Sequence, residues 1–357
     1  MGLFCRLLGH KYDETDVCVR CGTSRHSQGL KFKRTRDKQG YALVSVGKCR
    51  DERVVIPAYY NGKPVTTIGA HAFDSYDVEL ALSIPTTITT IGKMAFARSG
   101  LRSVYLGELT ELTLDTGAFY ECTALTEVTL PSTLTALPDA AFAGCTALEE
   151  LTLPDSMTTI GRNALERCCA VRKLFCPDAV TFIGSSAFAG CSSLERLRLP
   201  PSLTMLSPRL LSDCSALTAL DIPSTVTVIG DGALWGCSSL SEIVLPEGVT
   251  TIESNAMRDC ESLETFIFPA SLTTFLPNDE GEGDVFRGCS ALREITLHTN
   301  FKHFPTGMFA DCTALTDIHL VGGKSLDWRA IQKDEGFDTG SGTYVVHLIN
   351  GRIRKGN

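Results

Sequence analysis

One pattern of apolar and polar positions recurs along most of the chain with a period of 23 residues. Its clearest copy, residues 141–154, reads AFAGCTALEELTLP. With the cysteine of each copy as position 1, apolar residues occupy positions 4, 7, 9, 13 and 16. Proline takes position 10, glycine position 17, alanine position 20, and an aromatic or large apolar residue position 21. A fixed period of this length is typical of stacked-repeat solenoids.

Position 21 shows the register best and marks eleven units, in residues Phe73, Phe96, Phe119, Phe142, Leu165, Phe188, Leu211, Leu234, Met257, Phe286 and Phe309. The register shifts once, by six residues, through an acidic and glycine-rich insertion at 276–284. That insertion lacks the spaced ligands of a calcium loop, so we expect a solvated loop there. The pattern predicts about eleven 23-residue units over residues 58–321.

Within each unit, the pattern predicts two extended segments and one helical turn. Positions 7 and 9 alternate inward and indicate a short parallel strand. Proline at position 10 ends that strand, because it lacks the N–H that the ladder needs. A second extended segment ends at the glycine, and the spacing of positions 20, 21 and 1 suits a single helical turn. The expected fold class is therefore an α/β repeat solenoid with a parallel strand face.

Each end of the array has its own pattern, which predicts a cap. Residues 29–57 contain two alternating segments around RDKQG, which indicate a hairpin covering the first repeat. Residues 322–357 contain Trp328 and two alternating segments around Asn350 and Gly351, the strongest short hairpin signal. Caps of this kind shield the terminal repeats of a solenoid from water.

The first 28 residues form a separate head with the ligand types of a zinc site. Cys5, His10, Cys18 and Cys21 offer three thiolates and one imidazole, the donor set of a tetrahedral structural zinc site, with His26 as a reserve ligand. So short a segment cannot bury enough apolar surface to fold alone, so Zn²⁺ would supply its folding energy. The alternatives are an unfolded tail with incidental cysteines and a redox-active Cys-x2-Cys pair.

The repeat phrase Ile-Gly-x-x-Ala-Phe-x-x-Cys-x-x-Leu-x-x-Ile-x-Leu-Pro resembles that of the BspA-like bacterial leucine-rich repeats. The resemblance covers roughly residues 50–321 and includes the segment YNGKPVTTIG at 60–69. It implies a right-handed, curved solenoid used for binding, with no catalytic residues common to the family. Many members of that family are exposed at the cell surface and implicated in adhesion, so the resemblance also implies such a role.

Composition narrows the function and the compartment. A net charge of -8 argues against a nonspecific nucleic-acid binder, which needs a basic face. The 15 cysteines fall mostly at one repeat position, where their Cβ vectors run parallel, so we interpret them as buried free thiols. No apolar run suits a signal peptide or a membrane span. Together these features favour a cytoplasmic protein, with the cell surface as the alternative.

Outward positions 6 and 8 of the strand face offer a candidate binding patch for a protein partner. Its residues are Lys173, Phe175, Arg196 and Arg198, with Arg172 alongside at position 5. An exposed aromatic ring beside arginines on a rigid sheet is typical of an interface hot spot. The alternative is an ordinary solvated face on which nearby acids neutralise the arginines, namely Glu150, Glu195 and Asp221.

The sequence contains no recognisable catalytic motif. No serine or cysteine lies in a nucleophile-elbow or Cys-His context, and no phosphate-binding glycine loop follows a strand. His298, His303 and His319 lie close in the repeat register, but their spacing suits no helical metal motif. We therefore predict a non-enzymatic scaffold that binds a protein partner. The alternatives are a surface adhesin exported by an unrecognised route and a regulator acting through the zinc head.

Overall fold

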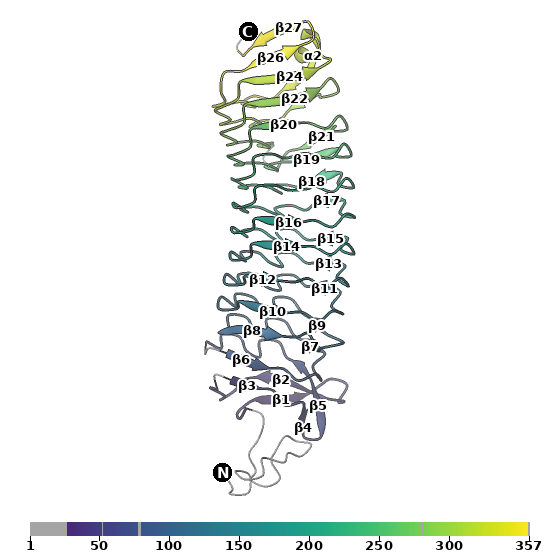
Figure 1. Ribbon diagram of the computed structural model, residues 1–357, viewed down its shortest axis with the longest axis vertical. Helices are drawn as coiled ribbons and strands as arrows, with labels where there is room; N and C mark the ends of the chain where they lie inside the picture. The colour runs from purple at the N-terminus through teal and green to yellow at the C-terminus, as the bar shows by residue number, and fades with distance from the viewer. Residues whose placement is uncertain (1–26, 52, 78–79, 280, 356–357) are drawn as a thin grey trace. The chain divides into compact units, whose positions relative to one another are not determined.

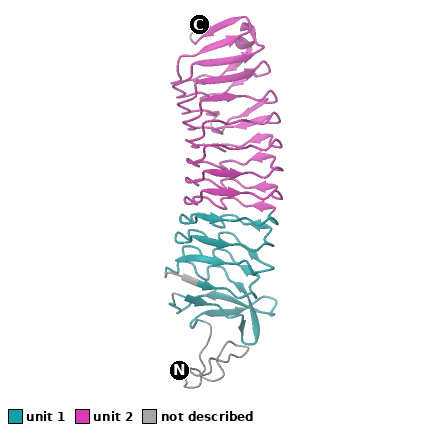
Figure 2. Cartoon of the chain, viewed as in Figure 1, with its two compact units in different colours: residues 1–157 teal, residues 158–357 magenta. Residues whose placement is uncertain are grey.

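The computed structural model describes residues 27–51, 53–77, 80–279 and 281–355. The predicted zinc ligands Cys5, His10, Cys18 and Cys21 lie outside the described residues. The chain divides into two compact units, Met1–Met157 and Thr158–Asn357 (Figure 2). Each unit is built as a parallel β-solenoid, in which most repeats contribute short strands to two columns (Figure 1).

The first unit opens with an antiparallel hairpin of β1 (Lys31–Arg34) and β2 (Tyr41–Ser45), which confirms the hairpin expected there. Its first ladder is parallel and contains β3 (Arg53–Val55), β6 (Leu80–Ser83), β8 (Leu101–Tyr105), β10 (Glu127–Thr129) and β12 (Glu150–Leu151). The second ladder continues from β2 through β5 (Lys63–Ile68), β7 (Thr90–Ile91) and β9 (Thr113–Leu114). The remaining strands are β4 (Tyr59–Tyr60), antiparallel to β5, and β11 (Ala136–Leu137).

In the second unit, one column of strands holds the predicted positions 6 to 8. It contains β14 (Lys173–Phe175), β16 (Arg196–Arg198), β20 (Thr265–Ile267), β22 (Glu294–His298) and β24 (Asp317–Val321). The cap strands β26 (Val345–Leu348) and β27 (Gly351–Arg354) extend the last sheet of this column. The other column contains β13 (Thr159–Ile160), β15 (Phe182–Ile183), β17 (Met205–Leu206), β18 (Val228–Ile229), β19 (Thr251–Glu253), β21 (Thr274–Leu276), β23 (His303–Phe304) and β25 (Gln332–Lys333). β26 and β27 pair antiparallel, which confirms the C-terminal hairpin.

The prediction of a helical turn between the second extended segment and the cysteine is wrong. The structure forms consecutive turns there, and α2 (Ser325–Ala330) is the single α-helix of the described residues. The N–H groups of Asn163, Leu165 and Arg167 donate to carbonyls of the following repeat at 3.0, 2.8 and 2.7 Å. An α-helix would commit these groups to carbonyls of their own segment. Left-handed backbone at Asn163 (φ 55°) and Arg167 (φ 58°) excludes the helix and turns every second N–H toward the next repeat.

Every cysteine at position 1 of the described repeats is a buried free thiol. This confirms the interpretation from the sequence. Most of these thiols also have a polar role that the sequence did not indicate. The thiol of Cys214 donates to the carbonyl of Phe188 at 3.2 Å, and the thiol of Cys237 donates to that of Leu211 at 3.2 Å. Burial raises the pKa of Cys237 to about 12, which keeps the thiol protonated and able to donate. Cysteine thus fills a small apolar site and satisfies a buried carbonyl.

Phenylalanines at position 21 form a stacked column in the core of the first unit. Phe96 and Phe119 lie 5.3 Å apart between ring centroids with an interplanar angle of 5°, and Phe119 and Phe142 lie 5.1 Å apart at 5°. All three side chains are fully buried. The 23-residue period therefore places one ring directly over the next, which gives the core its regular spacing.

The residue before each cysteine, at position 23, alternates between a larger side chain and glycine along the second unit. The residues are Arg167, Gly190, Asp213, Gly236, Asp259, Gly288 and Asp311, followed by Gly340 at the equivalent place in the cap. All have positive φ, between 57° and 75°. A Cβ at Gly236 would lie 2.6 Å from Asp213 Oδ1, and one at Gly288 would lie 2.1 Å from Asp259 Oδ1. Each glycine therefore leaves room for the side chain of the preceding repeat.

Candidate binding face on the second unit

Strands β14 and β16 hold four of the five predicted patch residues on one exposed face. The strands pair in parallel, with Lys173 opposite Arg196 and Phe175 opposite Arg198. The side chains between them, Leu174 and Leu197, are buried in the core. This alternation fixes the direction of the outward residues, because neighbouring side chains on a strand point to opposite faces. Phe175 is 57% exposed, which is unusual for a phenylalanine on a strand.

Two carboxylates pair with the arginines of this patch. Arg172 lies 3.7 Å from Glu195, as the alternative from the sequence anticipated, and Arg198 lies 2.5 Å from Asp178, which it did not. All four side chains are well exposed, so each pair contributes little to folding stability. Over the described part of the chain, Asp221 forms no ion pair.

Two cations of the patch stay free of carboxylate partners. Among the described residues, neither Lys173 nor Arg196 makes an ion pair, and both are exposed. The patch as a whole combines four cationic side chains, two carboxylates and one exposed aromatic ring. It therefore keeps an excess of positive charge on a chain whose net charge is -8.

A groove lies one repeat farther along the same face. The strands predicted at residues 219–222 and 242–245 are absent from the structure, although their sequence pattern matches that of the other repeats. A groove of about 480 Å³ occupies this place, lined by Ala219, Leu220, Asp221, Ile222, Ser224, Glu242, Val244 and Pro246. Val244 in its wall is 67% exposed, and Ile267 on β20 is 63% exposed. Val244 and Ile267 therefore form an exposed apolar area on this face.

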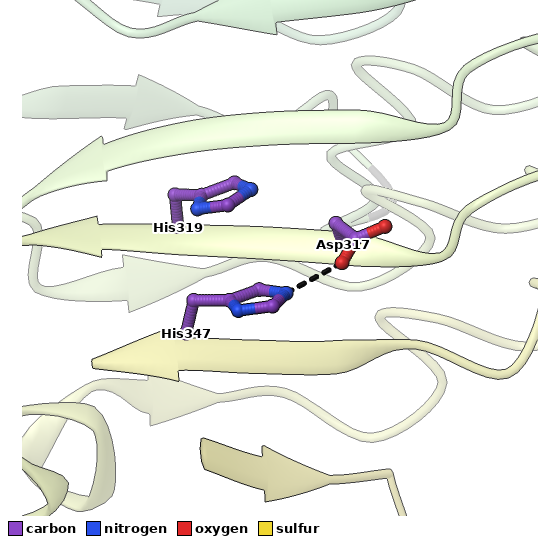
Figure 3. Close-up of side chains that lie close together, drawn as sticks. All are labelled: Asp317, His319 and His347. Carbon is purple, nitrogen blue, oxygen red and sulfur yellow. Dashed lines mark hydrogen bonds and ion pairs between the residues drawn. The ribbon is translucent and has the colours of Figure 1, made fainter. Parts of the chain in front are cut away.

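Histidines gather at the other end of the face, but in a different combination from the one the repeat register suggests. His319 of β24 stacks on His347 of β26, with ring centroids 4.5 Å apart and an interplanar angle of 9°. The Nε2 atom of His347 lies 2.5 Å from Oδ1 of Asp317 (Figure 3). His303 instead pairs with Asp334 at 2.9 Å. Sequence reasoning missed His347 because it belongs to the cap, outside the repeat register.

The repeats of this chain match those of a known family. A family model described as the BspA type leucine rich repeat region matches residues 52–172, 159–279 and 277–331, in six copies. The chain belongs to the BspA-type leucine-rich repeat family. This membership confirms the resemblance that the repeat phrase indicated. No curated protein matches the chain.

Solved structures of leucine-rich repeat proteins share the fold. A leucine-rich repeat protein from Bacteroides ovatus is 21% identical, with a TM-score of 0.65 over 88% of this chain and 80% of that chain. A leucine rich cell surface protein from Faecalibacterium prausnitzii is 24% identical, with a TM-score of 0.51 over 87% of this chain and 97% of that chain. At these identities the likeness concerns the fold alone. Among the described residues, no helix has the length and apolar character needed to cross a membrane.

Proposed function

We propose that this BspA-type repeat protein is a non-enzymatic scaffold that binds a protein partner through the β14–β16 face. Proteins with leucine-rich repeats commonly mediate protein interactions or adhesion, and family membership supports that general role. The single observation that carries the proposal is the exposure of Phe175 directly opposite Arg198. Aromatic rings and arginines are enriched among residues whose truncation weakens interfaces most.

The rigidity of the face favours binding. Leu174 and Leu197 anchor the two strands in the core, and the ladder between them fixes the backbone. A preformed surface loses little conformational entropy when it associates. The excess of positive charge indicates a partner with an acidic surface, which would accelerate encounter at low ionic strength.

Replacing Arg196 and Arg198 together by alanine should abolish capture of the partner. An interface arginine at a hot spot costs about 2 kcal/mol or more when truncated, so two together reduce affinity by at least about a hundredfold. The measurement is affinity capture from the native source with wild type and Arg196→Ala/Arg198→Ala protein, followed by quantification of each bound protein. Phe175→Ala should remove the same species from the captured set.

The matched control is Arg293→Ala/Arg354→Ala, which removes two exposed arginines of the same unit outside the patch. This variant has the same net charge as the test variant. It should retain the partner. Identical capture profiles for wild type and the Arg196→Ala/Arg198→Ala variant would contradict the proposal.

A second candidate function is adhesion at the cell surface. The structure from Faecalibacterium prausnitzii that shares this fold is described as a leucine rich cell surface protein. Localisation separates the two functions: immunolabelling of intact cells should detect an adhesin, whereas a cytoplasmic scaffold becomes accessible only after lysis.

We further propose that Cys5, His10, Cys18 and Cys21 bind one structural Zn²⁺ in the N-terminal head, through which a regulator would act. Purified protein should retain one equivalent of zinc by metal analysis, because thiolate-rich structural sites bind zinc tightly. The Cys18→Ser/Cys21→Ser variant should lose that equivalent. Cys169→Ser, which removes a partly exposed thiol in a described repeat, is the control and should keep it. Retention of zinc by the double variant would overturn this assignment.

A further inference from the structure

We propose that Asp317, His319 and His347 form a second metal site, for a borderline divalent ion of the Zn²⁺ type, on the strand face near the C-terminal cap. The topology places them together. β24 and β26 pair in parallel, with Asp317 opposite Val345 and His319 opposite His347. Asp317 and His319 are two residues apart on one strand, so they share a face, and the register brings His347 to the same face.

The three ligand groups are close enough to bind one ion after small side-chain rotations. One ligand atom from each residue lies within 4.8 Å of the others (Figure 3). Ligands around tetrahedral zinc bond at about 2.0–2.2 Å, which separates them by about 3.4 Å. The two imidazole rings are stacked, and a metal must lie in the plane of each ring, so one ring has to turn. The side chains of His319 and His347 are 38% and 24% exposed, which leaves space for that turn.

The donor set selects the class of metal. Two imidazoles and one carboxylate match zinc sites with three protein ligands and an open fourth position. Ca²⁺ and Mg²⁺ prefer oxygen ligands in larger number, so they fit poorly here. Because the three residues are partly exposed, the open fourth ligand position would be accessible to solvent.

Some neighbouring charges favour a bound cation and one opposes it. Oε1 of Glu294 lies 3.4 Å from Nε2 of His319, so this carboxylate adds negative charge and can orient the ring or complete the coordination. Arg352 of β27 is directly opposite His347, and its positive charge opposes a cation. Arg352 is exposed to solvent, whereas the two carboxylates of Asp317 and Glu294 are half-buried on the strand face. The balance of these charges favours a cation.

The position of the site gives the ion a mechanical role. His319 and Asp317 belong to the last repeat strand, and His347 belongs to the first strand of the C-terminal hairpin. An ion bound by all three would join the cap to the repeat array at the surface. A bound ion stabilises the state that holds its ligands together, so zinc should raise the temperature at which the cap unfolds.

Zinc titration of the full chain tests this site. Wild-type protein should bind one more equivalent of Zn²⁺ than His319→Ala or His347→Ala protein, measured by competition with a fluorescent zinc indicator. Loss of groups that merely orient ligands lowers metal affinity about 10- to 100-fold, so loss of a ligand should lower it at least tenfold. Co²⁺ gives a second readout, because imidazole and carboxylate ligands lack the intense thiolate charge-transfer absorption that the cysteines of the head would produce.

His303→Ala is the matched control, because it removes another histidine with a carboxylate partner in the same unit. It should leave zinc stoichiometry and affinity unchanged. Arg352→Gln should tighten binding by removing the opposing charge. Equal zinc binding by wild type, His319→Ala and His347→Ala, or an equal loss in His303→Ala, would overturn the proposal. Circular dichroism of each variant checks the fold, which should stay intact because Arg352 is exposed and the three histidines are partly exposed.

Discussion

Phe119→Ala is expected to destabilise the first unit by about 3–5 kcal/mol, the usual cost of deleting a buried phenyl ring. Phe119 is fully buried, and it stacks between Phe96 and Phe142 with ring centroids about 5 Å away on each side. Alanine leaves a cavity between two rings that are held by their own repeats and cannot close it. Loss of two aromatic stacks, each contributing about 0.5–1.5 kcal/mol, places the cost in the upper part of the range.

Urea unfolding monitored by circular dichroism measures this effect. Tyr105→Ala is the control, because Tyr105 is an aromatic residue of the same unit that is 63% exposed. Its replacement should cost less than about 1 kcal/mol, the size of a cross-strand side-chain contact. Equal midpoints for Phe119→Ala and Tyr105→Ala would show that the aromatic column does not stabilise the unit.

Gly230→Ala is expected to destabilise the second unit by about 3 kcal/mol, near the upper end of the range for overpacking. Gly230 fills position 17, where the chain turns against the preceding repeat. A Cβ there would lie 2.7 Å from the carbonyl oxygen of Leu206 and 2.7 Å from the backbone nitrogen of Pro208. Both atoms belong to backbone, which cannot move aside as the end of a side chain can. The substitution must push two repeats apart or distort one.

Gly248→Ala is the matched control in the same unit. The nearest atom to a Cβ at Gly248 is the carbonyl oxygen of Ser224 at 3.5 Å, an ordinary contact. This change should be neutral or stabilise by up to about 1 kcal/mol, because alanine restricts the unfolded chain more than glycine does. Thermal unfolding of both variants gives the comparison. If Gly230→Ala unfolds at the wild-type temperature, the close approach of the two repeats carries no energetic weight.

The sequence predicted the repeat register and most of the strands because both follow from local alternation. Leu174 and Leu197 read as inward and Lys173 and Arg196 as outward, and the structure agrees. The turn before the cysteine was predicted as helical because residue spacing alone cannot separate a helical turn from consecutive turns. The deciding bonds, such as Leu165 N–H to Ala187, join residues 22 positions apart.

The candidate sites were predictable only where the repeat register reaches. The exposed residues of β14 and β16 followed from positions 6 and 8, whereas the groove beside Val244 did not. Residues 242–245 have the same pattern as strand-forming repeats, so nothing local indicates the missing ladder. The pairing of His319 with His347 requires the alignment of the cap strand β26 on β24, which no repeated residue specifies. The predicted zinc ligands of the head remain a prediction, because they lie outside the described residues.

In the second unit, glycine alternates with larger residues at position 23, and this order bears on how the number of repeats there can change. Asp213 precedes Gly236 and Asp259 precedes Gly288, and in both pairs the side chain occupies space that only the following glycine leaves free. Removal of a single 23-residue copy from this region would bring two larger residues, or two glycines, into succession. Removal or insertion of 46 residues would keep the order. The structural module of this region is therefore a pair of repeats, because removal of a pair keeps each larger side chain against a following glycine.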